Sequence, residues 1–202
     1  MSGSRTVSSE RKEKLIEQHR YINVGHHDWW EDVYADFRED MKAVGIDVDR
    51  MYFSGFYSQG DGACFEGSLD NALTYLDHHH KGQYPMIRKL LEAGGGVYVS
   101  CEHRGHYCHQ NCTEFWADAD TLTGMLDQPT EFHETIVDQW QEELADEMVD
   151  FERDVIEQWR SYMQDLYSKL EDEYDHLTSD EIVWEAIDAN ELDDGDDWDE
   201  AT

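Results

Sequence analysis

The chain has 202 residues and a formal net charge of −33, with 15 Lys and Arg against 48 Asp and Glu. So few cations exclude a direct nucleic-acid binder, because phosphate recognition needs clustered Lys and Arg. With 39% hydrophobic and 12% aromatic residues, the chain is also too apolar for a disordered acidic protein, so we expect it to fold.

The sequence favours a cytoplasmic protein. It contains no apolar run of the roughly 20 residues needed to cross a bilayer, and residues 1–9 lack the apolar core of a signal peptide. Three of the four Cys lie between Cys101 and Cys112, among His residues, which is unlike a secreted disulfide framework. We therefore expect the protein to stay in a reducing cytosol.

The first part of the chain predicts an α+β fold. Three segments have helical character: 8–20, 28–44 and most of 68–93. Two pairs of aromatic, β-prone segments predict hairpins: 50–57 with 63–65, and 97–104 with 106–116. Two hairpins make a small antiparallel sheet of about four strands, with helices packed on one face.

From Phe132 onward the sequence predicts one long helix, or two helices joined end to end. No Gly or Pro interrupts a stripe of apolar residues at three- and four-residue steps: Phe132, Ile136, Trp140, Leu144, Met148, Phe151, Val155, Trp159, Tyr162, Leu166, Leu170 and Tyr174. The average step of about 3.8 exceeds the helical 3.6, so we expect a bend or a break near Phe151 or Tyr162. The motif Thr178–Glu181 predicts a capped last helix over 180–192.

These patterns divide the chain into four expected parts: a polar N-terminal segment 1–19, an α+β core 20–130, an acidic helical arm 131–192, and a disordered acidic tail 193–202. The charge is unevenly divided. Residues 1–113 hold 17 acidic and 12 basic side chains, whereas residues 114–202 hold 31 acidic and 3 basic ones. Such an asymmetry favours a dedicated acidic surface. The long helix also offers a face for a homodimer.

The acidic arm has three interpretations. Its carboxylates could only solvate a helix face, could adapt the protein to a very salty cytoplasm, or could imitate the phosphates of duplex DNA and occupy the basic groove of a DNA-binding protein. In the last interpretation the partner-binding residues are Glu142, Asp146, Glu147, Asp150, Asp154 and Glu157. Nucleic acid itself is not the expected ligand.

The second predicted hairpin carries a candidate metal site. With Arg104 and Gly105 as its two turn residues, His103 would face His106 and Cys101 would face Cys108. The candidate ligands are therefore Cys101, His103, His106 and Cys108, a set typical of zinc. A flat hairpin rarely surrounds an ion tetrahedrally, so buried thiols and half-exposed imidazoles are the alternative, and no cofactor is the main expectation.

Other polar motifs give weaker indications of chemistry. The turn Ser58–Gly62 could bind an anion through its amides, but it lacks Lys and Arg, so a structural turn stabilised by Asp61 is favoured. The run His78–His80 reads as a metal or partner contact, or as a polar helix end. We find no catalytic triad and no H-E-x-x-H motif. An enzyme, or a protein that binds a metal or nucleotide between the hairpins, is the alternative function.

The stretch from Tyr52 to Gly67 resembles a family of tailed-bacteriophage proteins that share a Phe-Ser-Gly-Phe-x-Ser-Gln-Gly-Asp-Gly-Ala core. Four further segments resemble that family too: 27–30, 104–109, 179–181 and 189–191. The resemblance implies viral origin and the host cytoplasm. By analogy with small acidic phage proteins, it also implies an anti-defence inhibitor that binds a host defence or DNA-processing protein.

Overall fold

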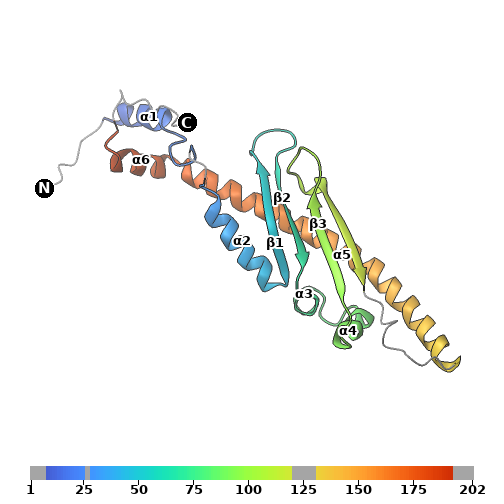
Figure 1. Ribbon diagram of the computed structural model, residues 1–202. Helices are drawn as coiled ribbons and strands as arrows, with labels where there is room; N and C mark the ends of the chain where they lie inside the picture. Colours follow the sequence, from blue (N-terminus) through green and yellow to red (C-terminus); the bar gives the residue numbers. More distant parts are fainter. Residues whose placement is uncertain (1–7, 26–27, 120–130, 193–202) are drawn as a thin grey trace. The chain divides into compact units, whose positions relative to one another are not determined.

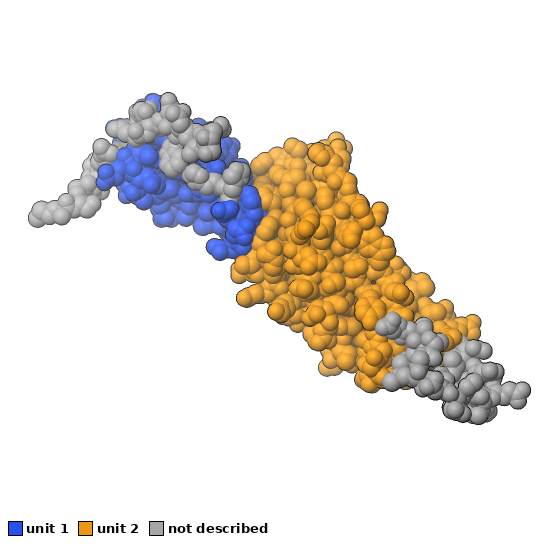
Figure 2. Space-filling view, in the orientation of Figure 1, with its two compact units in different colours: residues 1–33, 169–202 blue, residues 34–168 orange. Residues whose placement is uncertain are grey.

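The computed structural model describes residues 8–25, 28–119 and 131–192, with side chains from Trp140 onward in the last range. The chain forms two compact units, residues 1–33 with 169–202, and residues 34–168 (Figure 2). Along the chain the described elements are as follows (Figure 1): α1 Ser9–Gln18, α2 Glu31–Ala43, β1 Ile46–Ser54, β2 Gly62–Leu69, α3 Ala72–His79, α4 Pro85–Glu92, β3 Val97–His103, the short 3₁₀ helix η1 Gln110–Cys112, β4 Thr113–Ala119, α5 Glu131–Leu177 and α6 Asp180–Ala189.

The larger unit is built on a four-stranded antiparallel sheet in the order β1-β2-β3-β4. Strands β1 and β2 form the first predicted hairpin, from the pair Ile46↔Leu69 to the pair Ser54↔Gly62, with an irregularity between Val48 and Arg50. Gly45 ends α2 with a φ of +87°, and a Cβ at this position would lie 2.4 Å from the carbonyl oxygen of Asn71. The four-stranded antiparallel sheet, together with the helices, confirms the α+β class. Strand β1 begins at Ile46, earlier than the predicted segment 50–57.

Helix α5 packs against the sheet and supplies much of its core. The ring of Trp159 is completely buried and lies 5.7 Å from the ring of Phe65 in β2 and 6.1 Å from that of Phe115 in β4. From α2, Phe37 approaches the same Phe65 at 5.9 Å. Helix α5 thus crosses one face of the sheet and packs on it (Figure 1).

The predicted break in the long helix is wrong, because α5 is one helix of 47 residues. Its fully buried positions from Phe151 onward are Phe151, Val155, Trp159, Met163, Leu166 and Leu170. Four-residue steps rotate the stripe around the axis, and the three-residue step from Met163 to Leu166 rotates it back, so no break is needed. Met163 takes the buried place expected for Tyr162. Among the described residues, no helix combines the length and apolar character of a membrane span.

The smaller unit joins the two ends of the chain. Its core consists of Leu15 and Ile16 from α1 with Val183 and Ile187 from α6. Within the expected segment 1–19, helix α1 therefore packs with the last helix, because the apolar sides of two short amphipathic helices cover each other. The expected arm 131–192 is likewise divided, since residues 131–168 belong to the unit of the sheet. The expected tail 193–202 lies outside the described residues.

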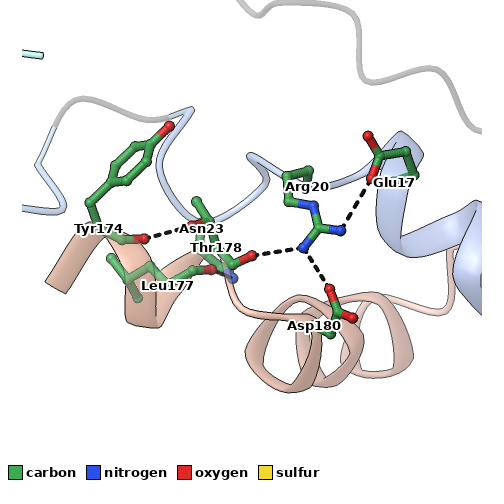
Figure 3. A network of polar contacts seen from close by, with 7 residues as sticks. All are labelled: Glu17, Arg20, Asn23, Tyr174, Leu177, Thr178 and Asp180. Atoms are coloured by element: carbon green, nitrogen blue, oxygen red, sulfur yellow. Dashed lines mark hydrogen bonds and ion pairs between the residues drawn. The ribbon is translucent and has the colours of Figure 1, made fainter. Parts of the chain in front are cut away.

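Side chains that follow α1 in the chain bind carbonyls at the C-terminal end of α5 (Figure 3). Asn23 donates to the carbonyl of Leu177 at 3.0 Å, and Arg20 donates to the carbonyl of Thr178 at 3.1 Å. Arg20 also pairs with Asp180 at 2.6 Å and with Glu17 at 3.1 Å. These donors satisfy acceptors that a helix leaves unpaired at its C-terminal end.

The predicted cap of the last helix is wrong in detail. Ser179 is the N-cap residue of α6, and its side chain makes no capping hydrogen bond. The hydroxyl of Thr178 instead donates to the carbonyl of Tyr174 at 2.8 Å. The hydroxyl of a Thr at the end of a helix can donate to a carbonyl of the preceding turn, and it is then not available to cap the next helix.

Candidate partner-binding surface

The six carboxylates predicted to bind a partner lie on α5, but they do not form one surface. Four of them are exposed: Glu142, Asp146, Asp150 and Glu157. Glu147 and Asp154 are half-buried. Residues 147 and 154 are seven apart, which is about two helical turns, so both lie on the same flank of α5. That flank packs against the segment that contains α4.

Glu147 caps α4 from outside that helix. Its Oε2 accepts the backbone N–H of Met86 at 2.8 Å and that of Ile87 at 3.1 Å. The N-cap residue of α4, Tyr84, has left-handed backbone angles and provides no side-chain cap, while Pro85 follows at the first turn. A carboxylate here satisfies unpaired helix donors and lies at the positive end of the helix dipole. Glu147 therefore has a structural role.

Asp154 also has an internal partner. The hydroxyl of Tyr84 donates to Asp154 Oδ2, and burial, followed by this hydrogen bond, raises the pKa of Tyr84. Tyr84 therefore remains a protonated donor at neutral pH. Of the six predicted partner-binding carboxylates, Glu147 and Asp154 therefore make contacts within the fold.

The exposed side of α5 keeps a strong negative charge. Between residues 140 and 168 the helix has nine carboxylates and two arginines. Arg153 pairs with Asp150 at 2.8 Å and with Asp154 at 3.4 Å. Both Arg153 and Asp150 are more than half exposed, so this ion pair is screened by water and contributes little stability. The outward residues Glu142, Asp146 and Glu157 make the surface acidic.

The pairing that supported the zinc site is wrong. In the β3–β4 ladder His103 pairs with Thr113 and Cys101 pairs with Phe115, so neither faces the residue that was expected. The turn is not a two-residue turn at Arg104 and Gly105. It is the longer loop 104–112, which is closed by a hydrogen bond from the amide of Arg104 to the carbonyl of Cys112 at 2.7 Å.

The four predicted metal ligands have separate environments. The Cys101 thiol is buried and donates to the carbonyl of Phe65 at 3.3 Å, and burial raises its pKa to about 12. His103 Nε2 lies 3.0 Å from the carbonyl oxygen of Tyr107. His106 is exposed. Cys108 is half-buried, and burial raises the pKa of the Cys108 thiol. Among the described residues, no three or more His, Cys, Asp or Glu side chains are arranged to hold a metal ion.

Asp61 and His79 have the structural roles that the sequence offered as alternatives to ligand binding. Asp61 Oδ2 accepts the amide of Ser58 at 2.6 Å, so Asp61 stabilises the turn of the first hairpin. His79, at the end of α3, lies with its Nε2 2.6 Å from the Tyr162 hydroxyl of α5. Burial, with smaller effects of His78 and His80, lowers the pKa of His79 to about 4. This histidine connects α3 to α5 as a neutral side chain.

One group of thiols was not predicted from the sequence. Cys64 in β2 is completely buried, and its pKa is raised to about 12 by burial first and then by the neighbouring Cys108 and Cys112. Only the longer loop 104–112 brings these residues near β2. Cys64 lies in a run of four buried residues, Gly62–Phe65, and no local sequence pattern predicted its neighbours.

Fold and surface together define an acidic α+β protein in which a four-stranded antiparallel sheet packs on one long helix. The chain belongs to the family DUF8835, described as a domain of unknown function, which it matches over residues 29–180. The match covers α2, the sheet and the whole of α5, and leaves out α1 and nearly all of α6. No curated protein and no solved structure matches the chain significantly.

Proposed function

We propose that this protein binds and blocks a basic, DNA-handling protein of a bacterial host, with the outward carboxylates of α5 in the place of DNA phosphates. The observation that carries the proposal is the exposure of Glu142, Asp146, Asp150 and Glu157 along one unbroken helix. These residues extend over about 22 Å of helix axis, the length of about six base-pair steps of B-DNA.

The surroundings of these carboxylates support the proposal. The packing of Val155 and Trp159 against the sheet holds the opposite side of α5 in place, so the charges are fixed before a partner arrives. Fixed charges lose less conformational entropy on binding than those of a flexible acidic tail. The bacteriophage resemblance of the Tyr52–Gly67 stretch supports the choice of a host protein as the target.

A variant that neutralises four exposed carboxylates tests the proposal: Glu142→Gln, Asp146→Asn, Asp150→Asn and Glu157→Gln. Glu147 and Asp154 stay unchanged because they stabilise the fold. A matched control variant neutralises four exposed carboxylates elsewhere in the larger unit: Asp36→Asn, Glu39→Gln, Asp47→Asn and Glu92→Gln. Both variants carry the same net charge.

Immobilised wild type, test variant and control variant are incubated with a bacterial lysate, and retained proteins are identified by mass spectrometry. We expect the wild type and the control variant to retain the same DNA-binding protein, released by added salt and by duplex DNA, and the test variant to lose it. If the test variant retains this partner with unchanged salt dependence, the carboxylates only solvate the helix. If duplex DNA does not compete, mimicry is wrong.

A further inference from the structure

Strand β4 ends the sheet and has one open side. It pairs with β3 from Val97↔Ala119 to His103↔Thr113, and within the described residues no strand pairs with its other side. The backbone N–H and C=O groups on that side can therefore receive an added strand. The seven residues of β4 are enough for a short extended segment.

A hollow on α5 lies beside this open edge. It has a volume of about 500 Å³ and is lined by Val149, Glu152, Arg153, Ile156, Glu157 and Arg160. The guanidinium of Arg160 lies 5.7 Å from the ring centre of Phe115, which places the hollow next to β4. Val149 is 66% exposed, so the hollow includes apolar surface, although Val149 lies about 16 Å along the helix axis from Arg160.

The two faces of β4 differ in chemistry. Glu114, Trp116 and Asp118 alternate on the exposed face, while Phe115 and Ala117 point the other way and are half-buried. Arg104 is the only cation with a described ion pair here, and it is shared between Glu102 at 2.9 Å and Glu114 at 3.4 Å. The exposed face of the edge therefore keeps a negative charge beside the ring of Trp116.

The negative charge of the β4 edge favours a basic segment over a second copy of the chain as its occupant. A second copy of the chain, paired antiparallel about Trp116, would place Glu114 opposite Asp118 of the other copy, and like charges directly opposite each other are destabilising. The net charge of −33 adds a general repulsion between copies. A segment with Lys or Arg at these positions gains both ion pairs instead, while the ring of Trp116 already has the guanidinium of Arg104 at 5.8 Å from its centre.

We propose that the open edge of β4 and the hollow on α5 bind an extended segment of a basic protein by β-strand addition. The segment has the pattern basic–apolar–any–apolar–basic. Its cations meet Glu114 and Asp118, and its apolar side chains lie next to Phe115 and Ala117 and face the hollow. The inference rests on the proposed function only in taking a basic protein as the partner. It adds that this partner is recognised through an extended segment that pairs with β4.

The probe is a fluorescent peptide with the core Lys-Val-Thr-Val-Lys, measured by anisotropy at low salt. Its control is a peptide of the same composition with the order Lys-Lys-Thr-Val-Val. Two further versions are N-methylated at either the odd or the even positions. Alternate amides of a strand face opposite sides, so we expect one methylated version to bind like the parent and the other to lose binding.

On the protein, Glu114→Lys with Asp118→Lys should weaken binding of the ordered peptide by about tenfold or more. Asp47→Lys with Asp49→Lys makes the same change of charge on the opposite edge strand β1, and should leave affinity within about twofold. An α5 variant that keeps Glu157, with only Glu142, Asp146 and Asp150 neutralised, serves as the α5 variant here and should still bind the peptide, because none of these three residues lines the hollow. Circular dichroism checks each fold, and the methylated peptides decide the question if the β4 variant does not fold.

Equal binding of the ordered and scrambled peptides, equal binding of the two methylated versions, or no binding at about 1 mM peptide would overturn the proposal. Retained affinity in the β4 variant would do the same. Loss of peptide binding only in the α5 variant would reject the β4 site and leave the proposed function standing. Loss only in the β4 variant, together with lysate capture by the α5 variant, would reject the proposed function and leave this site standing.

Discussion

Neighbouring carboxylates on α5 have different roles because of the side of the helix on which they lie. Asp146 and Glu147 are adjacent in sequence, yet their side chains point about 100° apart around the axis. Asp146 is exposed, whereas Glu147 accepts two backbone amides of α4. The identity of a carboxylate therefore does not indicate whether it is available to a partner; its contacts do.

Replacing Glu147 should destabilise the larger unit. Glu147→Ala leaves the amides of Met86 and Ile87 without an acceptor, and we expect a loss of about 1 kcal/mol in the free energy of unfolding, as for a lost helix cap. Asp146→Ala is the control and should change it by less than about 0.5 kcal/mol. Urea denaturation measures both. Equal effects of the two substitutions would show that the cap has no energetic role.

His79 should make stability depend on pH. Its pKa is about 4 in the folded protein, against about 6.5 in an unfolded chain. Between these values the unfolded state binds more protons, so the contribution of neutral His79 is present above about pH 6.5 and is lost as the pH falls toward 4. In His79→Gln this contribution to the pH dependence is absent.

Unfolding free energies of wild type and His79→Gln at pH 7.5 and pH 5 measure this effect. We expect the advantage of the wild type over the variant to shrink at pH 5. The comparison cancels the titration of the many carboxylates, which both proteins share. A difference between the two proteins that is the same at both pH values would contradict the lowered pKa.

At the scale of single elements, α5 connects the sheet to the acidic surface. Its buried side carries Trp159 between Phe65 and Phe115, and its opposite side carries the exposed carboxylates. The four-residue steps, with one three-residue step from Met163 to Leu166, keep both sides aligned between Phe151 and Leu170. The packing of the apolar stripe on the sheet therefore fixes which carboxylates of α5 face outward.

Trp159→Ala should cost about 3–5 kcal/mol of unfolding free energy, because it removes a completely buried aromatic ring and leaves a cavity against the sheet. Val149→Ala is a control on the same helix, since Val149 is 66% exposed, and we expect a change within about 0.5 kcal/mol. Chemical denaturation measures both. A cost below about 1 kcal/mol for Trp159→Ala would mean that α5 is not packed on the sheet in solution.

At the scale of the whole molecule, charge opposes folding. The net charge is −33, and residues 114–202 carry 31 of the 48 acidic side chains. Bringing these carboxylates into one folded chain creates repulsion that the unfolded chain relieves by expanding. Salt screens this repulsion over a Debye length of about 10 Å at 0.1 M ionic strength.

We therefore expect the melting temperature to rise between about 10 mM and 500 mM sodium chloride. The variant with Glu142, Asp146, Asp150 and Glu157 neutralised should melt higher than the wild type at low salt, and its melting temperature should rise less. Thermal unfolding followed by circular dichroism measures these changes. A melting temperature that falls with salt would indicate that the ion pairs of the fold outweigh the repulsion.

The sequence by itself determined the features that depend on neighbouring residues. The α+β class, the first hairpin about Gly60–Gly62, the long helix and the position of the negative charge follow from turn residues and from periodicity, which act over a few residues. The tertiary structure decided the β3–β4 register with its loop 104–112, the pairing of α1 with α6, and which carboxylates of α5 are internal. These features depend on contacts between segments far apart in the chain, and the energy of such contacts is absent from any local pattern.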